Sequence, residues 1–185
     1  VQGVAEFDNE RWTWAAGGLD IFEWGPTYPS LTLLAPGQLR VDGLGAAEGV
    51  QACRWYIVRH QCYGLPAFKI DGSAQTTLDQ VTLFSVPGMG VVATDATDVT
   101  LQGVQIERRE GRPLSIAADG SHFASCSGTI TLRDCHYEGQ GDDGLNIHGN
   151  FASVAQIDAS RHEVLLAGGP AQEGFEVIPG ELYEF

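Results

Sequence analysis

The 185-residue chain is short of positive charge and has no long apolar run. Ten Lys and Arg residues stand against 24 Asp and Glu residues, which leaves a formal net charge of −14 at pH 7. Such a surface repels phosphates, so we expect no nucleic-acid partner, and it disfavours a polyanionic ligand relative to a neutral one. The sequence also lacks the run of about eighteen apolar residues that a membrane helix needs. We therefore expect no membrane span, and no signal-peptide pattern is visible.

Cysteine is also scarce, and its spacing matches no metal or redox motif. The four residues are Cys53, Cys62, Cys126 and Cys135, and none belongs to a Cys-x-x-Cys pair. Their even number permits two disulfides in an exported protein. The favoured interpretation is that they are small apolar core residues.

A repeat occupies the middle of the chain. Three segments align on Leu78, Leu101 and Leu132, and the next aligned apolar positions are Val91, Leu114 and Leu145. The first step is 23 residues and the second is 31, so we assign the eight extra residues to a loop insertion at Gly120–Ser127. In that register Asp119 aligns with Asn150.

Each repeat holds two short alternating β-patterns separated by turn residues, without a helical period. An all-β chain with repeats of this length predicts a right-handed parallel β-helix, in which each coil buries its inward residues against its neighbours. A leucine-rich repeat lacks support because its asparagine ladder and helical return are missing, and a jelly roll requires no fixed period.

The two ends of the chain depart from the repeat. We assign residues 1–150 to the β-helix, with the first fifty or so forming an irregular coil or a cap. Residues 151–185 alternate around Gly-Gly-Pro and Pro-Gly turns, which is typical of antiparallel hairpins. They are expected to form an antiparallel, barrel-like β segment, as part of a second domain.

Asp142 and Asp143 lie side by side at a glycine-flanked turn before the strand Gly144–Ile147. The alignment places them opposite Gly88/Met89 and Gly111/Arg112 of the earlier coils. At such a turn both carboxylates can lean over one surface, and each then raises the proton affinity of the other. An acid beside a base is what glycoside cleavage requires. For the pair taken alone, ordinary turn chemistry is the favoured explanation, and a calcium site is a further alternative without a supporting aspartate spacing.

Other polar residues are expected near this pair. Asp119 ends the apparent strand Pro113–Asp119 of the preceding coil, just before the assumed insertion, and insertions on solenoids usually decorate the binding face. His148 ends the strand that follows the pair, and Asn146 lies within it. We interpret His122 and His162 as structural or exposed.

The run from Asp119 to Asn150, "DGSHFASCSGTITLRDCHYEGQGDDGLNIHGN", resembles glycoside hydrolase family 110. These are inverting exo-α-1,3-galactosidases acting on blood-group-B-type and linear α-galactosyl ends. The step from Asp119 to Asp142 also looks like the family's. The tail "VIPGELYEF" is similar to the start of an antiparallel barrel that follows the family's β-helix.

The resemblance implies a catalytic centre of Asp119, Asp142 and Asp143 that works without cofactor or metal on a galactose-terminated glycan. It makes His148 and Asn146 candidates for sugar hydroxyl contacts. It further implies a secreted or periplasmic protein, because family members meet extracellular glycans, and it is compatible with a homo-oligomer. Polygalacturonases share the fold and the paired aspartate, but their Asn-Thr-Asp and Arg-Ile-Lys segments are absent here.

Two other hypotheses stay open. One is a non-catalytic β-helix that binds glycans or displays surface. The other is a calcium-assisted polysaccharide lyase, for which Arg109 and Arg112 are near enough to be considered as the base. Tryptophans often stack on sugars, but all four lie outside the clear repeat, so none is assigned: Trp12, Trp14, Trp24 and Trp55.

Overall fold

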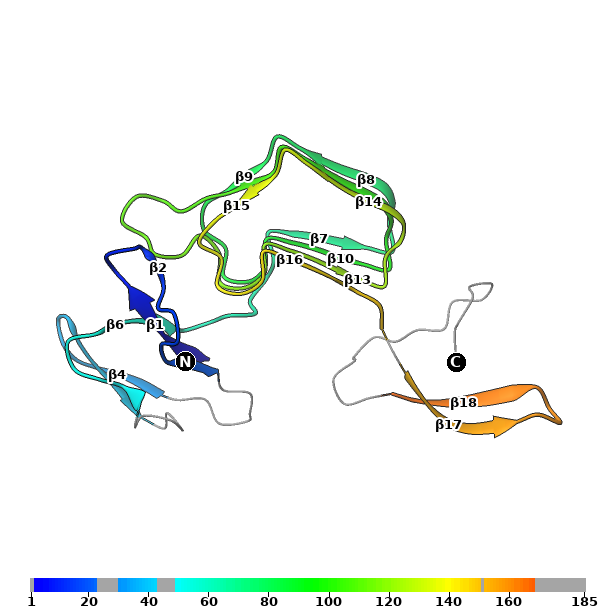
Figure 1. The fold of residues 1–185 in the computed structure, drawn as a ribbon, viewed down its shortest axis with the longest axis horizontal. Helices are drawn as coiled ribbons and strands as arrows, with labels where there is room; N and C mark the ends of the chain where they lie inside the picture. Colours follow the sequence, from blue (N-terminus) through cyan, green and yellow to red (C-terminus); the bar gives the residue numbers. More distant parts are fainter. Residues whose placement is uncertain (1, 23–29, 43–48, 151, 169–185) are drawn as a thin grey trace.

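The computed structural model describes residues 2–22, 30–42, 49–150 and 152–168, and this part of the chain is all-β, without an α-helix (Figure 1). Trp24 and the tail "VIPGELYEF" lie outside the described residues. Three parallel sheets stack in the middle of the chain, as in a parallel β-helix. Antiparallel strands precede and follow them.

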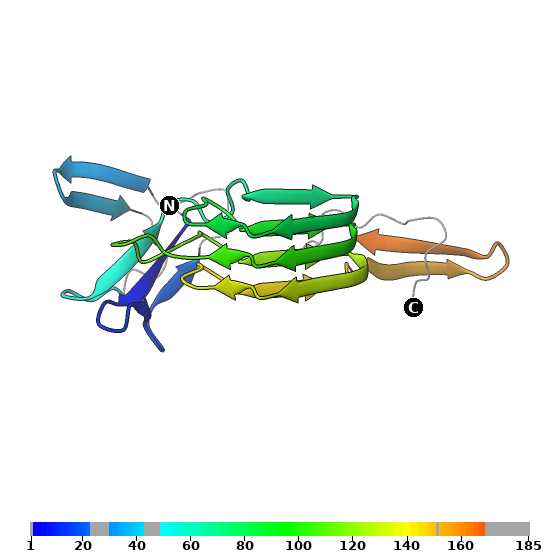
Figure 2. The same cartoon turned by 90° about the horizontal axis from the view of Figure 1, so that it is seen from above.

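The parallel sheets contain one strand from each successive coil. The first sheet has the order β16 (Leu145–His148), β13 (Ser121–Ala124), β10 (Val91–Thr94), β7 (Phe68–Asp71). The second has the order β14 (Ser127–Arg133), β11 (Thr97–Gln102), β8 (Ala74–Asp79). The third has the order β15 (His136–Tyr137), β12 (Gln105–Ile106), β9 (Thr82–Leu83). Figure 2 shows the coils from the side as successive layers.

The core lies between these sheets. It is built from the side chains that point inward, one at every second position along each strand. Val91, Ala93, Leu101 and Phe123 are fully buried. Leu101 pairs in register with Leu78 on one side and Leu132 on the other, which confirms the alignment of these three leucines. Apolar side chains thus stack on their counterparts one coil away, because only a neighbouring coil can exclude water from them.

The insertion lies elsewhere than expected. Two residues lie between Leu83 and the bridge residue Val86, whereas nine lie between Ile106 and its partner Ile116 in the next coil. The extra residues therefore form the loop 107–115, which protrudes toward β2 in Figure 1, and the prediction of an insertion at Gly120–Ser127 is wrong. The middle of this loop, residues 109–112, is exposed, whereas the segment assigned to the insertion contains β13 with its buried Phe123.

An antiparallel sheet precedes the coils. β1 (Gly3–Asp8) pairs with β2 (Thr13–Trp14), β3 (Asp20–Phe22) and β6 (Trp55–Arg59). β4 (Ser30–Ala35) and β5 (Gln38–Asp42) form a separate hairpin. After the last coil, β17 (Ala152–Asp158) and β18 (Glu163–Gly168) form an antiparallel hairpin whose turn lies between Asp158 and Glu163. The Pro residues of the Gly-Gly-Pro and Pro-Gly turns on which the prediction rested lie outside the described residues.

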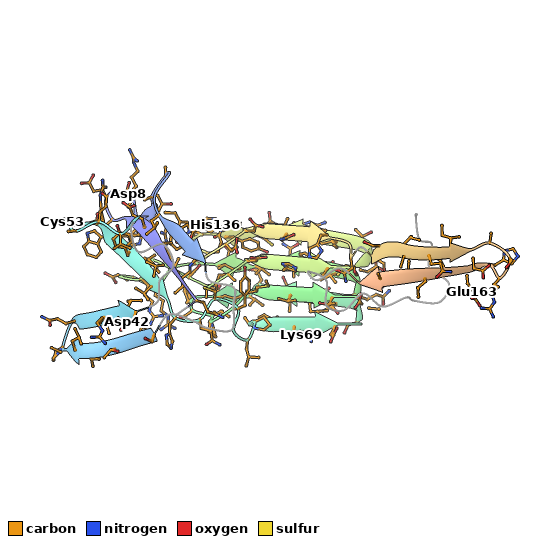
Figure 3. All side chains as sticks on the ribbon, turned by 90° about the horizontal axis from the view of Figure 1, so that it is seen from below. Asp8, Asp42, Cys53, Lys69, His136 and Glu163 are labelled. Carbon is orange, nitrogen blue, oxygen red and sulfur yellow. The ribbon has the colours of Figure 1, made fainter. Side chains whose placement is uncertain are left out.

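The four cysteines are all free thiols. Cys62 is buried, and Cys126 and Cys135 pack against the core, as expected of small apolar residues. Cys53 is exposed at the outer end of the N-terminal sheet (Figure 3), so the core interpretation is wrong for this residue. Within the described residues, no helix is long and apolar enough to cross a bilayer.

Candidate active site

The paired aspartates lie at the corner where the third sheet turns into the first. Ile116 bridges to Gln140, and Ser121 pairs with Leu145, so Asp142 aligns with Ala118 and Asp143 aligns with Asp119. The expected alignment of Asp119 with Asn150, and of the pair with Gly111/Arg112, is therefore wrong. Adjacent rungs of a sheet are only about 4.8 Å apart, so the register brings Asp119 beside the pair.

Glycine makes this close approach feasible. Gly120 follows Asp119, and its amide donates a hydrogen bond to the Asp143 carbonyl at 2.8 Å. A Cβ at Gly120 would lie 2.5 Å from the carbonyl oxygen of Gly144 on the next coil. Asp119 does not end a strand, as expected from "PLSIAAD", but precedes one, because β13 begins at Ser121. The acidic residues of two coils thus precede consecutive strands at one corner.

Asp119 is the buried member of the group, with 4% of its surface exposed. Its Oδ2 lies 2.7 Å from Nδ1 of His122. Burial raises the pKa of Asp119, the hydrogen bond with His122 lowers it, and the negative charges of Asp142 and Asp143 raise it further. The negative charges of Asp142 and Asp143 thus act on Asp119, as expected for carboxyls that lie on adjacent rungs.

Asp142 and Asp143 are exposed, so they can meet a ligand. The Tyr63 hydroxyl donates a hydrogen bond to Oδ2 of Asp142 at 2.8 Å, and burial together with that bond raises the pKa of Tyr63. The phenol therefore stays protonated and acts as a donor. Nδ2 of Asn146 lies 3.4 Å from Oδ2 of Asp143, so Asn146 faces the cluster and does not ladder inside the helix.

Two hollows meet at Asp142. One, of about 260 Å³, lies between the aromatic residues Trp12 and Trp14 of the N-terminal sheet and Arg108 of the loop. The other, of about 330 Å³, lies between Arg59, Trp14 and the aspartate pair. A ligand can therefore reach the carboxylates across aromatic surface, the kind of surface that packs on sugar rings.

The N-terminal sheet holds the corner in place. Nε1 of Trp14 donates to the Gln140 carbonyl at 3.3 Å, and Nη1 of Arg59 donates to the Gly141 carbonyl at 3.3 Å. Arg59 is buried, packs over the Trp14 ring and pairs with Asp20. Residues far apart in sequence thus fix the backbone that immediately precedes Asp142.

His122 is a site residue that sequence reasoning missed. It was interpreted as structural or exposed, yet its ring contacts both Asp119 and, through Nε2, Nε2 of His148 at 2.9 Å. The signal was the alternation in β13, where inward Ser121 and Phe123 leave His122 facing out. His148 ends β16 as predicted and is exposed.

The residues considered for lyase chemistry face another way. Arg109 packs over the Phe84 ring and Arg112 donates to the Ser85 hydroxyl at 2.9 Å, whereas Arg108 is the arginine beside Asp142. Among the described residues, no group of three His, Cys, Asp or Glu side chains has the arrangement of a metal site.

The fold and the site together define a stack of parallel β-coils that carries a three-aspartate corner beside an aromatic hollow. No family model matches the chain. Curated relatives do: it is 32% identical over 162 residues to α-1,3-galactosidase A of Shewanella woodyi and 30% identical over 131 residues to α-1,3-galactosidase B of Bacteroides thetaiotaomicron. It is also 25% identical over 155 residues to α-1,3-galactosidase B of Akkermansia muciniphila. The chain belongs to the family of these proteins, glycoside hydrolase family 110.

The matches cover 86%, 70% and 82% of this chain, respectively. They cover only 26%, 21% and 20% of the three relatives. The chain thus spans about a quarter of the length of the Shewanella woodyi relative.

Proposed function

We propose that this chain carries the catalytic corner of an exo-α-1,3-galactosidase, which removes terminal galactose from glycans. The observation that supports the proposal best is the register of β13 and β16, which sets Asp119 beside Asp143 while Asp142 faces the two hollows. The names of the relatives supply the substrate class. The negative net charge fits a neutral sugar better than a uronate.

In the proposed mechanism the exposed pair and the buried carboxyl have different roles. One of the exposed pair donates a proton to the glycosidic oxygen, and the hydrogen-bond donors Tyr63 and Asn146 hold that pair in position. Asp119 orients a water molecule and removes its proton while the oxygen of that water attacks the anomeric carbon. Inversion requires acid and base about 6.5–9.5 Å apart, which two adjacent rungs with side chains leaning apart can provide.

Further features of the proposal concern the whole protein. The coils are right-handed, as β-strand crossovers almost always are, and the segment after Asn150 begins a second, barrel-like domain. His148 and Asn146 contact sugar hydroxyls. The protein acts outside the cytoplasm, secreted or periplasmic, where it meets glycans, and it is compatible with homo-oligomer formation.

The test uses the full-length protein that contains this chain and an α-galactosyl-1,3-galactose substrate. We expect release of galactose, with the β-anomer appearing first by proton NMR, and loss of turnover in Asp119→Asn, Asp142→Asn and Asp143→Asn with folding intact. Asp134→Asn is the matched control, because Asp134 lies at the turn between β14 and β15. Binding of the disaccharide without turnover would instead establish a glycan-binding β-helix, and turnover restored only by calcium after chelation would establish a lyase-like site.

A further inference from the structure

Three hydrogen bonds run in series from the buried carboxyl of Asp119 to the surface. Oδ2 of Asp119 lies 2.7 Å from Nδ1 of His122, and Nε2 of His122 lies 2.9 Å from Nε2 of His148. Nδ1 of His148 lies 3.0 Å from the Gly149 carbonyl oxygen. The two rings meet edge to face, with centroids 4.9 Å apart. The path crosses from β13 to β16 and ends in solvent.

The bond between Nδ1 of His148 and the Gly149 carbonyl determines how many hydrogens the fully bonded path contains. A backbone carbonyl only accepts, so Nδ1 of His148 must carry a hydrogen. Each of the other two links needs one hydrogen as well, which makes three. Two neutral imidazoles and a carboxylate supply only two, so the fully bonded arrangement holds one additional proton and has no net charge. That proton can reside on Asp119, His122 or His148 without breaking a link.

Resting on the proposed hydrolase function, we propose that His122 and His148 form a proton relay that serves Asp119. Before the reaction the path is one proton short of the fully bonded arrangement: Asp119 is ionised, and the two hydrogens are on Nε2 of His122 and Nδ1 of His148. As the water oxygen bonds to the anomeric carbon and the glycosidic bond breaks, one water proton passes to Asp119 and completes the path, while the acid protonates the leaving oxygen. The Asp119 proton then moves to Nδ1 of His122, and the Nε2 proton of His122 moves to Nε2 of His148. The exposed His148 imidazolium releases a proton to solvent. Proton exchange then returns the hydrogens to Nε2 of His122 and Nδ1 of His148, and Asp119 is again a base that the path can serve.

Burial explains why Asp119 needs such a path. Burial raises the pKa of Asp119, and only the contact with His122 favours the ionised form, while Asp142 and Asp143 oppose it. A buried carboxyl would therefore keep the proton it has taken from water. The relay moves that proton to His148, which solvent can reach.

The neighbouring strands offer no competing path. On β10 the residues in register with His122 and Ala124 are Val92 and Thr94, which do not titrate. One rung further, on β7, Lys69 and Asp71 pair with each other at 3.1 Å. From β16 the register partner of His122 is Asn146, which does not titrate. From the N-terminal side Tyr63 donates to Asp142, and Arg59 and Asp20 line the hollow that Asp142 and Asp143 share.

Nitrogen-15 NMR of the histidine rings tests the relay without reference to activity. We expect His148 to carry its hydrogen on Nδ1, the minor tautomer of free histidine, because the Gly149 carbonyl accepts it. Both rings in the Nε2–H tautomer in the unmutated protein would overturn the relay.

Kinetics of the full-length protein separate the relay from the hydrolase proposal. We expect His122→Gln to lower kcat about tenfold with little change in KM, and to move the acidic limb of the kcat profile to higher pH. His148→Ala should lose activity that added imidazole restores, and His136→Gln, on the third sheet (Figure 3), should be unchanged. If the unmutated protein turns over and His122→Gln has an unaltered pH profile, the relay is contradicted and the hydrolase proposal is not. No wild-type turnover of the disaccharide would overturn both proposals.

Discussion

The Tyr63 hydroxyl donates to Oδ2 of Asp142 at 2.8 Å although the two residues lie 79 positions apart in the sequence. The contact joins the segment before the first coil to the turn into the last described one. Tyr63 is therefore a positioning residue for Asp142, the exposed carboxyl that lines both hollows.

Removing the Tyr63 hydroxyl should therefore impair turnover. A hydrogen bond to a charged group contributes about 1.5–3 kcal/mol, so Tyr63→Phe should lower kcat/KM by roughly 10- to 100-fold if the whole contribution acts in the transition state. Steady-state kinetics at constant fold, checked by circular dichroism, measure this. Tyr56→Phe is the matched control, because its hydroxyl contacts only Gln51 among the described residues. Equal kinetics in the two variants would contradict the role of Tyr63.

The buried carboxyl of Asp119 should lower stability at neutral pH. Its folded-state pKa is raised, chiefly by burial, so the native state binds the proton more tightly than the unfolded state and stability falls as pH rises through that window. Asn mimics the protonated carboxyl. We expect Asp119→Asn to melt at a higher temperature than wild type at pH 7, with the gap closing below a pH of about 4. A gap independent of pH in thermal melts would contradict the assignment.

Gly120 should tolerate no side chain. An added Cβ would lie 2.5 Å from the Gly144 carbonyl oxygen and 3.0 Å from the Tyr137 ring, so the β13–β16 spacing must widen. Overpacking of this kind costs about 1–3 kcal/mol. Denaturant unfolding of Gly120→Ala should show this loss, whereas Gly149→Ala, whose Cβ meets nothing within 4 Å, should unfold like wild type.

The N-terminal sheet should be required for the corner. Trp14→Ala removes the bond to the Gln140 carbonyl, the contact with Arg59 and the edge-to-face packing on Phe7. We expect a loss of about 2 kcal/mol in the free energy of unfolding, below the cost for a fully buried tryptophan, and a raised KM. Trp55→Ala is the control, because that side chain is 60% exposed and surface substitutions usually change stability by less than about 0.5 kcal/mol. Equal effects would show that the sheet does not support the site.

The thiols should differ in reactivity. Burial raises the pKa of the Cys62 and Cys126 thiols, which lowers their thiolate fraction, whereas Cys53 is exposed. A thiol-specific reagent should modify Cys53 rapidly in the native protein and the buried Cys62 only after unfolding, with the half-buried Cys126 and Cys135 reacting at rates between these two. Dithiothreitol should leave the melting temperature unchanged. A melting temperature lowered by reductant would reveal a disulfide instead.

The sequence by itself determined the strand character of the coils and the stacking of Leu78, Leu101 and Leu132. Inward positions must be apolar at every coil, so the repeat is visible in the residues themselves. It also placed Asp142 and Asp143 at a turn and His148 at a strand end. The position of the insertion was not determined, because extra residues in any turn change the length of a coil equally. The strand register, the burial of Phe123 and the exposure of residues 109–112 distinguish the alternatives.

Tertiary structure alone decided which residues surround the aspartates. The ladder between β13 and β16 set Asp119 beside Asp143 and let His122 reach His148 across one rung. Tyr63 came from a segment whose sequence carries no period. Such contacts depend on which segments far apart in the sequence pack together. The local alternation of apolar and polar residues does not determine that packing.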